Sequence, residues 1–167
     1  PVVIGTAGCG PEGEADDAGD VAAADERAGE PLGVEEAVRR MTVPKGFRVE
    51  VVASEPDIVN PVAMTFDERG RLWVCESFDY PNELQPPGEG RDRIRICEDT
   101  DHDGKADKVT TFLDGLNCPT GFQFYKDGVL VMQAPDLWFV RDTNGDGKAD
   151  WKERVLMGMD SADSHHT

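Results

Sequence analysis

The chain has 167 residues, with 34 acidic and 17 basic side chains, a formal net charge of -17 and a hydrophobic content of 38%. This acidity leaves no basic surface to neutralise phosphates, so it excludes nucleic-acid binding and electrostatic binding to anionic membranes. No apolar run is long enough to span a bilayer, so the sequence predicts no transmembrane helix.

The first nine residues form an apolar stretch that ends in Ala7-Gly8-Cys9. Such a stretch resembles the end of a bacterial lipoprotein signal, in which the cysteine becomes lipidated. We therefore expect residues 1–9 to be the remnant of an export signal rather than a folded element, with Cys9 as the lipidation site. The alternative is a stretch of small residues with an incidental cysteine.

Residues 10–42 are rich in acids and contain no aromatic residue. Such a segment cannot bury enough apolar area to offset the entropy lost on ordering. The sequence therefore predicts a disordered acidic tether, with one short helix near its end where Val34, Ala37, Val38 and Met41 have helical spacing.

From residue 43 onward, short apolar or alternating runs are separated by Gly, Pro, Asn and Asp. This pattern is typical of β-strands joined by turns and predicts an all-β fold for residues 43–167. The predicted strands are 47–52, 63–66, 72–75, 94–97, 109–112, 121–124, 129–132, 137–140 and 155–157.

The strand pattern is repeated. Residues 61–74 align without gaps on residues 119–132, and residues 94–99 recur 43 residues later as 137–142, with a Pro- and Gly-rich insertion around residues 78–90 of the first copy. A repeat of about 43 residues with four short strands is the signature of a β-propeller blade. Because a propeller needs at least four blades, the sequence predicts a fragment of about two to three blades, truncated at its C-terminal end.

Two nearly identical acidic segments, Asp99–Asp107 and Asp142–Asp150, fit the pattern D-x-[DN]-x-D-G-x-x-D. In a calcium loop, oxygens at positions 1, 3, 5, 7 and 9 surround one cation, and glycine at position 6 allows a sharp turn. The predicted ligands are Asp99, Asp101, Asp103, the carbonyl of Lys105 and Asp107, and then Asp142, Asn144, Asp146, the carbonyl of Lys148 and Asp150. The alternative is a pair of solvated acidic turns.

An EF-hand is the rival interpretation of these loops. Glu153 stands at position 12 of the second loop, but Thr110 stands there in the first, and the flanking runs are strands rather than long amphipathic helices. We therefore expect the loops to lie in β-hairpins, where the ion stabilises the fold.

Two other groups could carry chemistry. His165 and His166 have acids nearby and could supply a general base or a metal ligand, whereas the alternative is an exposed polar loop. The cysteines Cys75, Cys97 and Cys118 form no C-x-x-C motif, so they favour small buried side chains. In an exported protein, a Cys75–Cys97 disulfide is the alternative.

Four segments together, residues 44–56, 60–74, 98–107 and 115–121, resemble the N-terminal propeller of the membrane-bound dehydrogenase family that is abundant in planctomycetes. That propeller is similar to the soluble quinoprotein glucose/sorbosone dehydrogenases and is commonly followed by helical repeats and a c-type cytochrome domain. The resemblance places His165 or His166 where these enzymes carry the base that takes the substrate hydroxyl proton while hydride passes to pyrroloquinoline quinone (PQQ).

The resemblance implies an exported oxidoreductase, periplasmic or at the cell surface, that oxidises a neutral sugar or alcohol and passes electrons to a cytochrome-type acceptor. Its cofactors would be calcium, PQQ and a haem c held in a domain beyond this chain. The competing hypothesis is a non-enzymatic, calcium-stabilised propeller that binds carbohydrate or a protein partner.

Overall fold

The computed structural model describes residues 3–9, 31–79, 85–86 and 88–159, and for residues 3–9 the backbone alone. Most of the predicted tether and both histidines of interest, His165 and His166, lie outside the described residues. No helix among the described residues is long and apolar enough to cross a membrane.

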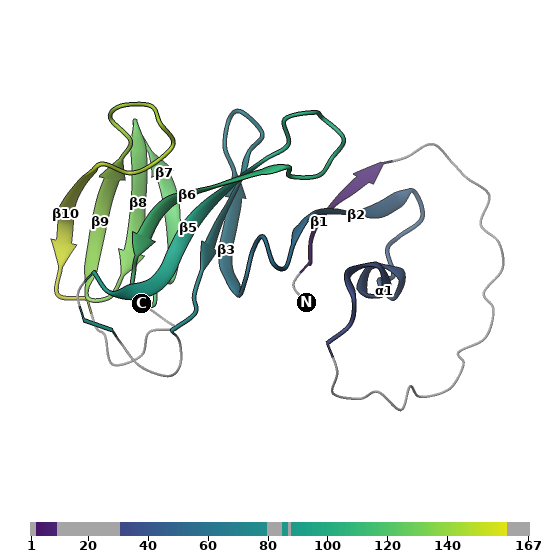
Figure 1. Ribbon diagram of the computed structural model, residues 1–167, viewed down its shortest axis with the longest axis horizontal. Helices are drawn as coiled ribbons and strands as arrows, with labels where there is room; N and C mark the ends of the chain where they lie inside the picture. Colours follow the sequence, from purple (N-terminus) through teal and green to yellow (C-terminus); the bar gives the residue numbers. More distant parts are fainter. Residues whose placement is uncertain (1–2, 10–30, 80–84, 87, 160–167) are drawn as a thin grey trace.

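Two four-stranded antiparallel sheets make up most of the fold (Figure 1). In each sheet the strands follow one another in chain order, so neighbours in sequence are neighbours in space. This up-and-down order is that of propeller blades and confirms the predicted all-β class. The first sheet contains β3 (Pro61–Phe66), β4 (Leu72–Glu76), β5 (Gly90–Glu98) and β6 (Lys108–Gly115), and the second contains β7 (Gly121–Tyr125), β8 (Gly128–Gln133), β9 (Asp136–Arg141) and β10 (Trp151–Met157).

The largest hydrophobic core lies between these two sheets. The indole of Trp73 is its centre, because it packs edge-on against Phe112 of its own sheet and Phe124 of the second, with ring centroids 4.6 Å and 5.1 Å away. The buried members of this core are Trp73, Cys75, Ile94, Ile96, Phe112, Leu116, Val129, Val131 and Val140. The two sheets therefore pack face to face as one unit.

The N-terminal elements precede the first sheet, and the last of them packs against part of its other face. They are β1 (Val3–Cys9), helix α1 (Val34–Arg39) and β2 (Phe47–Ser54), and β1 pairs antiparallel with β2. A second core joins β2 to the first sheet through the buried residues Ala53, Ile58, Leu72, Val74 and Cys97. Because β4 is covered on both faces, all five of its residues are buried.

Strand β1 differs from the expectation that residues 1–9 form no folded element. Its backbone pairs with β2 along Val3–Cys9. The physical reason is that β2 has an open edge of backbone N–H and C=O groups, which an extended segment of the same chain can satisfy. Whether Cys9 is lipidated stays a prediction.

The repeat is also less regular than its gapless alignment indicates. Phe66 pairs with Leu72 across the first turn, whereas its counterpart Phe124 pairs with Val129 across a turn one residue shorter. Leu72 therefore corresponds to Val129, not to Leu130. A shift of one residue in a strand moves every side chain to the opposite face, so this difference decides which residues enter the core.

Candidate functional sites at the two ends of the sheets

The two acidic loops lie at one end of the sheets, which we call the acidic-loop end. The first joins β5 to β6 and the second joins β9 to β10, so both lie in β-hairpins, as predicted. Gly104 and Gly147 stand at position 6 with φ of 91° and 85°, in the left-handed region that glycine adopts without steric cost. The sharp turn expected of a cation loop is therefore formed in both.

Three carboxylates meet in the first loop. One oxygen each of Asp99, Asp101 and Asp103 lies within 4.8 Å of the others, which suits a single hard cation. In the second loop, the corresponding residues are Asp142, Asn144 and Asp146, and the Asn144 amide donates to Asp146 at 3.4 Å. The side chains at positions 1, 3 and 5 thus lie near one another in the first loop, and those at positions 3 and 5 in the second.

The aspartates at position 9 have a different role. Both carboxylate oxygens of Asp107 accept hydrogen bonds from Thr100, one from its backbone N–H at 3.1 Å and one from its hydroxyl at 2.6 Å. Asp150 accepts the same two bonds from Thr143, both at 2.8 Å. These residues close the loops, and Asp107 is not part of the three-carboxylate group.

Hydrogen bonds favour the charged form of these acids. Burial acts to raise the pKa of Asp99, but bonds from the backbone of Gly104, His102 and Asp103 outweigh it and hold the pKa below its usual value. The backbone and hydroxyl of Thr143 likewise lower the pKa of Asp150. Both loops therefore hold anionic carboxylates that are available to a cation.

Each acidic loop also contacts the structure that precedes its sheet. The backbone N–H of Ala106 donates to the carbonyl of Val52 in β2 at 2.8 Å, and that of Ala149 donates to the carbonyl of Phe112 in β6 at 2.7 Å. Ordering of a loop is therefore linked to the packing of neighbouring units.

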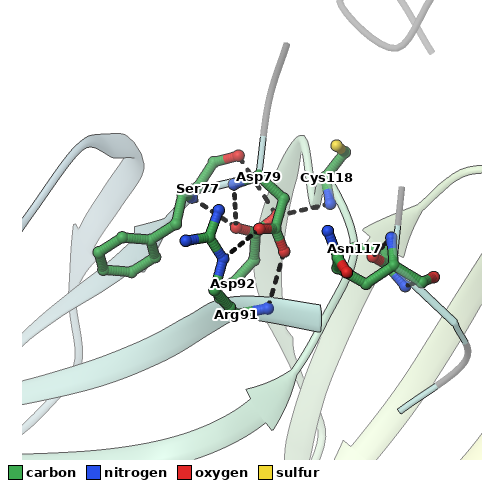
Figure 2. Close-up of polar contacts among 8 residues, drawn as sticks. Ser77, Asp79, Arg91, Asp92, Asn117 and Cys118 are labelled. Carbon is green, nitrogen blue, oxygen red and sulfur yellow. Dashed lines mark hydrogen bonds and ion pairs between the residues drawn. The ribbon is translucent and has the colours of Figure 1, made fainter. Parts of the chain in front are cut away.

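Buried carboxylates gather at the opposite end, where β4, β6, β8 and β10 end and where the chain crosses from one sheet to the next. We call it the crossover end. Asp92 is fully buried and accepts hydrogen bonds from the backbone N–H groups of Phe78, Asp79 and Cys118 and from the hydroxyl of Ser77, as Figure 2 shows. A single carboxylate thus holds together the start of the β4–β5 loop and the connection between the two sheets.

The other two buried acids are paired with arginines. Asp79 accepts from the backbone N–H and the Nε of Arg91, and the backbone bond is the main reason that the pKa of Asp79 lies below its usual value. Glu76 accepts from the backbone N–H of Val59 and forms an ion pair with Arg93. None of these three acids is among the site residues that the sequence predicts. The available signal was Asp92, which alternates with Ile94 and Ile96 and therefore occupies a core-facing position of β5.

These sites lie within a recognised protein family. Residues 33–167 match the model of a family described as a domain of unknown function, DUF7133. The chain belongs to this family. No curated protein and no solved structure matches it. The DUF7133 domain includes α1, β2, both sheets, both acidic loops and all three buried carboxylates, whereas β1 precedes it.

The cysteines of the DUF7133 domain are free thiols. Cys75 belongs to the core between the two sheets and Cys97 to the core beside β2, so they face opposite sides of the first sheet. The disulfide alternative is therefore wrong, and the prediction of buried thiols is confirmed for this pair. Burial raises the pKa of Cys75 to about 12 and that of Cys97 to about 11.

Proposed function

We propose that this DUF7133 chain is the N-terminal part of an exported oxidoreductase of the quinoprotein type. It oxidises a hydroxyl group of a neutral sugar or alcohol and passes electrons to a haem domain. Support comes from the resemblance of residues 44–56, 60–74, 98–107 and 115–121, and from two sheets with the strand order of propeller blades.

The observation that carries this proposal is that the two ends of the sheets hold different features. Both acidic loops lie at the end where they contact a preceding strand, and the long β4–β5 loop lies at the other. The chain also leaves β10 at the crossover end, where Met159 donates to the carbonyl of Pro135 at 3.0 Å. The proposed base, His165 or His166, follows within a few residues.

In this proposal the acidic loops bind calcium. The donor set of Asp99, Asp101 and Asp103 fits a hard cation, and the carbonyls of Lys105 and Lys148 would be the ligands at position 7. A bound cation would remove the repulsion among these carboxylates. It would also order the turn that places Ala106 and Ala149 against their acceptors.

The described residues do not fit an anionic quinone. Arg91 and Arg93 are the cations that belong to the buried acids of the crossover end, and both are already paired, with Asp79 and Glu76. No cluster of unpaired cations is described there. The proposal for PQQ therefore rests on the resemblance alone.

The catalytic proposal is tested on the full-length protein. After addition of PQQ and calcium, dye reduction is measured with a panel of aldoses and alcohols. We expect turnover that a His165→Ala/His166→Ala double variant lowers at least about 100-fold, the range of general-base catalysis. The matched control is Glu68→Ala, which changes an exposed acid of the β3–β4 turn outside both acidic loops. Absence of turnover, or full turnover in the double variant, would contradict the proposal.

The calcium proposal is tested separately by titration calorimetry and thermal unfolding. Calcium at about 100 times its Kd should stabilise the chain by about 2.7 kcal/mol for each loop that it occupies. Asp101→Ala and Asp146→Ala should each remove part of this gain, whereas Glu68→Ala, an exposed acid in the β3–β4 turn, should retain all of it. An unchanged gain in both loop variants would contradict the proposal.

One observation favours the competing function, a propeller that binds carbohydrate or a protein partner. A groove of about 370 Å³ lies between the two sheets at the acidic-loop end. Its lining combines aromatic and charged side chains, among them Trp73, Phe124, Arg71, Lys126 and Asp142. Such a volume and lining suit a small polar ligand. Glycan titrations monitored by Trp fluorescence test this function, and a response that Lys126→Ala does not weaken would contradict it.

A further inference from the structure

Three antiparallel strand pairs of the fold share one irregularity in their second strand. In β5–β6, Phe112 is skipped between the pairs Arg95–Thr111 and Ile94–Leu113. In β9–β10, Val155 is skipped at the same place, between Arg154 and Leu156. In β1–β2, Val52 is skipped between Val51 and Ala53. Because a β-bulge is a specific feature of a ladder, β1–β2 has the pattern of the outer half of a sheet.

The contacts of the bulged residues agree with this equivalence. The carbonyl of Val52 accepts the N–H of Ala106, and the carbonyl of Phe112 accepts the N–H of Ala149. Each bulge therefore receives the acidic loop of the sheet that follows it. By this criterion, β2 occupies the position before the first sheet that β6 occupies before the second sheet.

An exposed apolar stripe marks where the inner half of that preceding sheet would lie. Val62, Met64 and Phe66 of β3 are 51%, 56% and 49% exposed. Met64 and Phe66 pair with Val74 and Leu72, as Phe122 and Phe124 pair with Val131 and Val129 in the second sheet.

The counterparts of the stripe in the second sheet are covered. The rings of Phe122 and Phe124 pack against Trp73, a residue of the second strand of the preceding sheet, with centroids 6.4 Å and 5.1 Å away. The stripe therefore lacks the neighbours that its counterparts have. Among the described residues, β1 also pairs with β2 alone, so its other edge is open.

We propose that the stripe of Val62, Met64 and Phe66, together with the open edge of β1, is the docking surface for an antiparallel strand pair of the same repeat. The pair completes a four-stranded sheet with β1 and β2, and its second strand places a large apolar side chain over Met64 and Phe66.

The occupant comes from a further repeat of the same polypeptide. In a second copy of the described fold, β3–β4 is already bonded to β5 and β7–β8 to β9, and the two-stranded pair β1–β2 has the pattern of an outer half rather than of the missing inner half. This inference rests on the propeller arrangement of the proposed function, but it is independent of calcium and of catalysis.

The experiment supplies the strand pair from the chain itself. Residues 119–135, which contain β7, β8 and the turn into β9, are added directly before Val3 of the 167-residue chain in place of Pro1 and Val2. The junction keeps the natural register. Ile4 pairs with Ala53, the residue after the bulge in β2, and Leu137 pairs with Leu156, the residue after the bulge in β10. Thermal unfolding, hydrogen exchange and sedimentation are compared with those of the original chain.

We expect the extended chain to be a monomer whose Tm is at least about 5 °C higher, the size expected for a gain of more than about 1 kcal/mol in a chain of this length. The added strands and β3 should exchange their amides at least about 10-fold more slowly. Phe66→Asp should abolish both effects. Leu156→Asp, at a comparably exposed apolar residue of β10 (54%), should preserve them.

Three results would overturn the proposal: rapid exchange of the added strands with no rise in Tm, a rise that survives Phe66→Asp, or a dimer of the original chain that Phe66→Asp dissolves. The last result would assign the stripe to a second copy.

If the extended chain aggregates, a dye at a Met64→Cys position of the original chain, titrated with peptide 119–135, gives the second measurement. A dye response should saturate, and its absence would count against the proposal. Loss of calcium binding or of turnover would leave this result unchanged, so failures of the two proposals are distinguishable.

Discussion

Asn60 and Cys118 adopt the same left-handed backbone conformation, each with φ of 45° and each directly before a proline. Both lie where the chain enters the first strand of a sheet, and a buried carboxylate holds the backbone at each place. Asp92 accepts the N–H of Cys118 at 2.6 Å, and Glu76 accepts the N–H of Val59, the residue before Asn60. Non-glycine residues in this region cost free energy, of order 1 kcal/mol or more, which these hydrogen bonds offset.

Asp92→Asn should destabilise the fold by about 3 kcal/mol. The amide keeps one acceptor oxygen but turns an NH₂ group toward buried backbone donors, which then lose their partner. Urea unfolding measures the change. Asp114→Asn, an exposed position on the neighbouring strand β6, is the matched control and should change stability by less than about 0.5 kcal/mol. Equal stability of the two variants would show that Asp92 does not hold the crossover.

Phe112→Ala should cost about 3–4 kcal/mol, because it opens a cavity beside Trp73 in the core between the sheets. Phe66→Ala, at a half-exposed position of β3, should cost less than about 1 kcal/mol. Chemical denaturation of the 167-residue chain compares the two truncations. A larger loss for Phe66 would mean that the stripe on β3 is buried in solution.

Asp67 should make stability depend on pH in the acid range. Burial acts to raise the pKa of Asp67, but hydrogen bonds from the Trp73 indole, Arg71 and Arg69 outweigh it and hold the pKa below the ordinary value of 3.8. The folded state therefore releases the proton more readily than the unfolded chain. The stabilisation is complete above the ordinary pKa and is lost as the pH falls through it toward the lower folded-state pKa.

Asp67→Asn should thus reduce stability near neutral pH by about 1–2 kcal/mol and reduce the further loss below about pH 4. Urea unfolding across this pH range measures both effects. Glu68→Gln, an exposed neighbour, should retain the parent pH dependence. An identical acid-range slope in Asp67→Asn and the parent would refute this role.

Cys75 and Cys97 should react slowly with a thiol reagent in the native protein. Their buried sulfurs and raised pKa values leave almost no thiolate at mildly alkaline pH. In a Cys9→Ser background, we expect their labelling to be at least about 100-fold slower than in denaturant, and slower than that of the half-buried Cys118. Rapid native labelling of three thiols would contradict the placement of Cys75 and Cys97 in separate cores.

Local patterns in the sequence were sufficient to predict the strands. Alternating and apolar runs between turn residues located β2 through β10, and the D-x-[DN]-x-D-G pattern placed the acidic loops in hairpins, because both features depend on near neighbours in the chain. The helix near residues 34–41 was predicted for the same reason and is α1.

Only the tertiary structure decided the features that depend on distant partners. Cys75 and Cys97 face opposite sides of one sheet because strand pairing fixes which side chains share a face. The burial of Asp92 depends on donors from Ser77 to Cys118, which no local pattern brings together. The equivalence of β2 and β6 rests on a shared bulge and a carbonyl contact, and neither leaves a mark in the residue types. Residue type and spacing thus determined the elements of this protein, and long-range backbone pairing determined which of them form a unit.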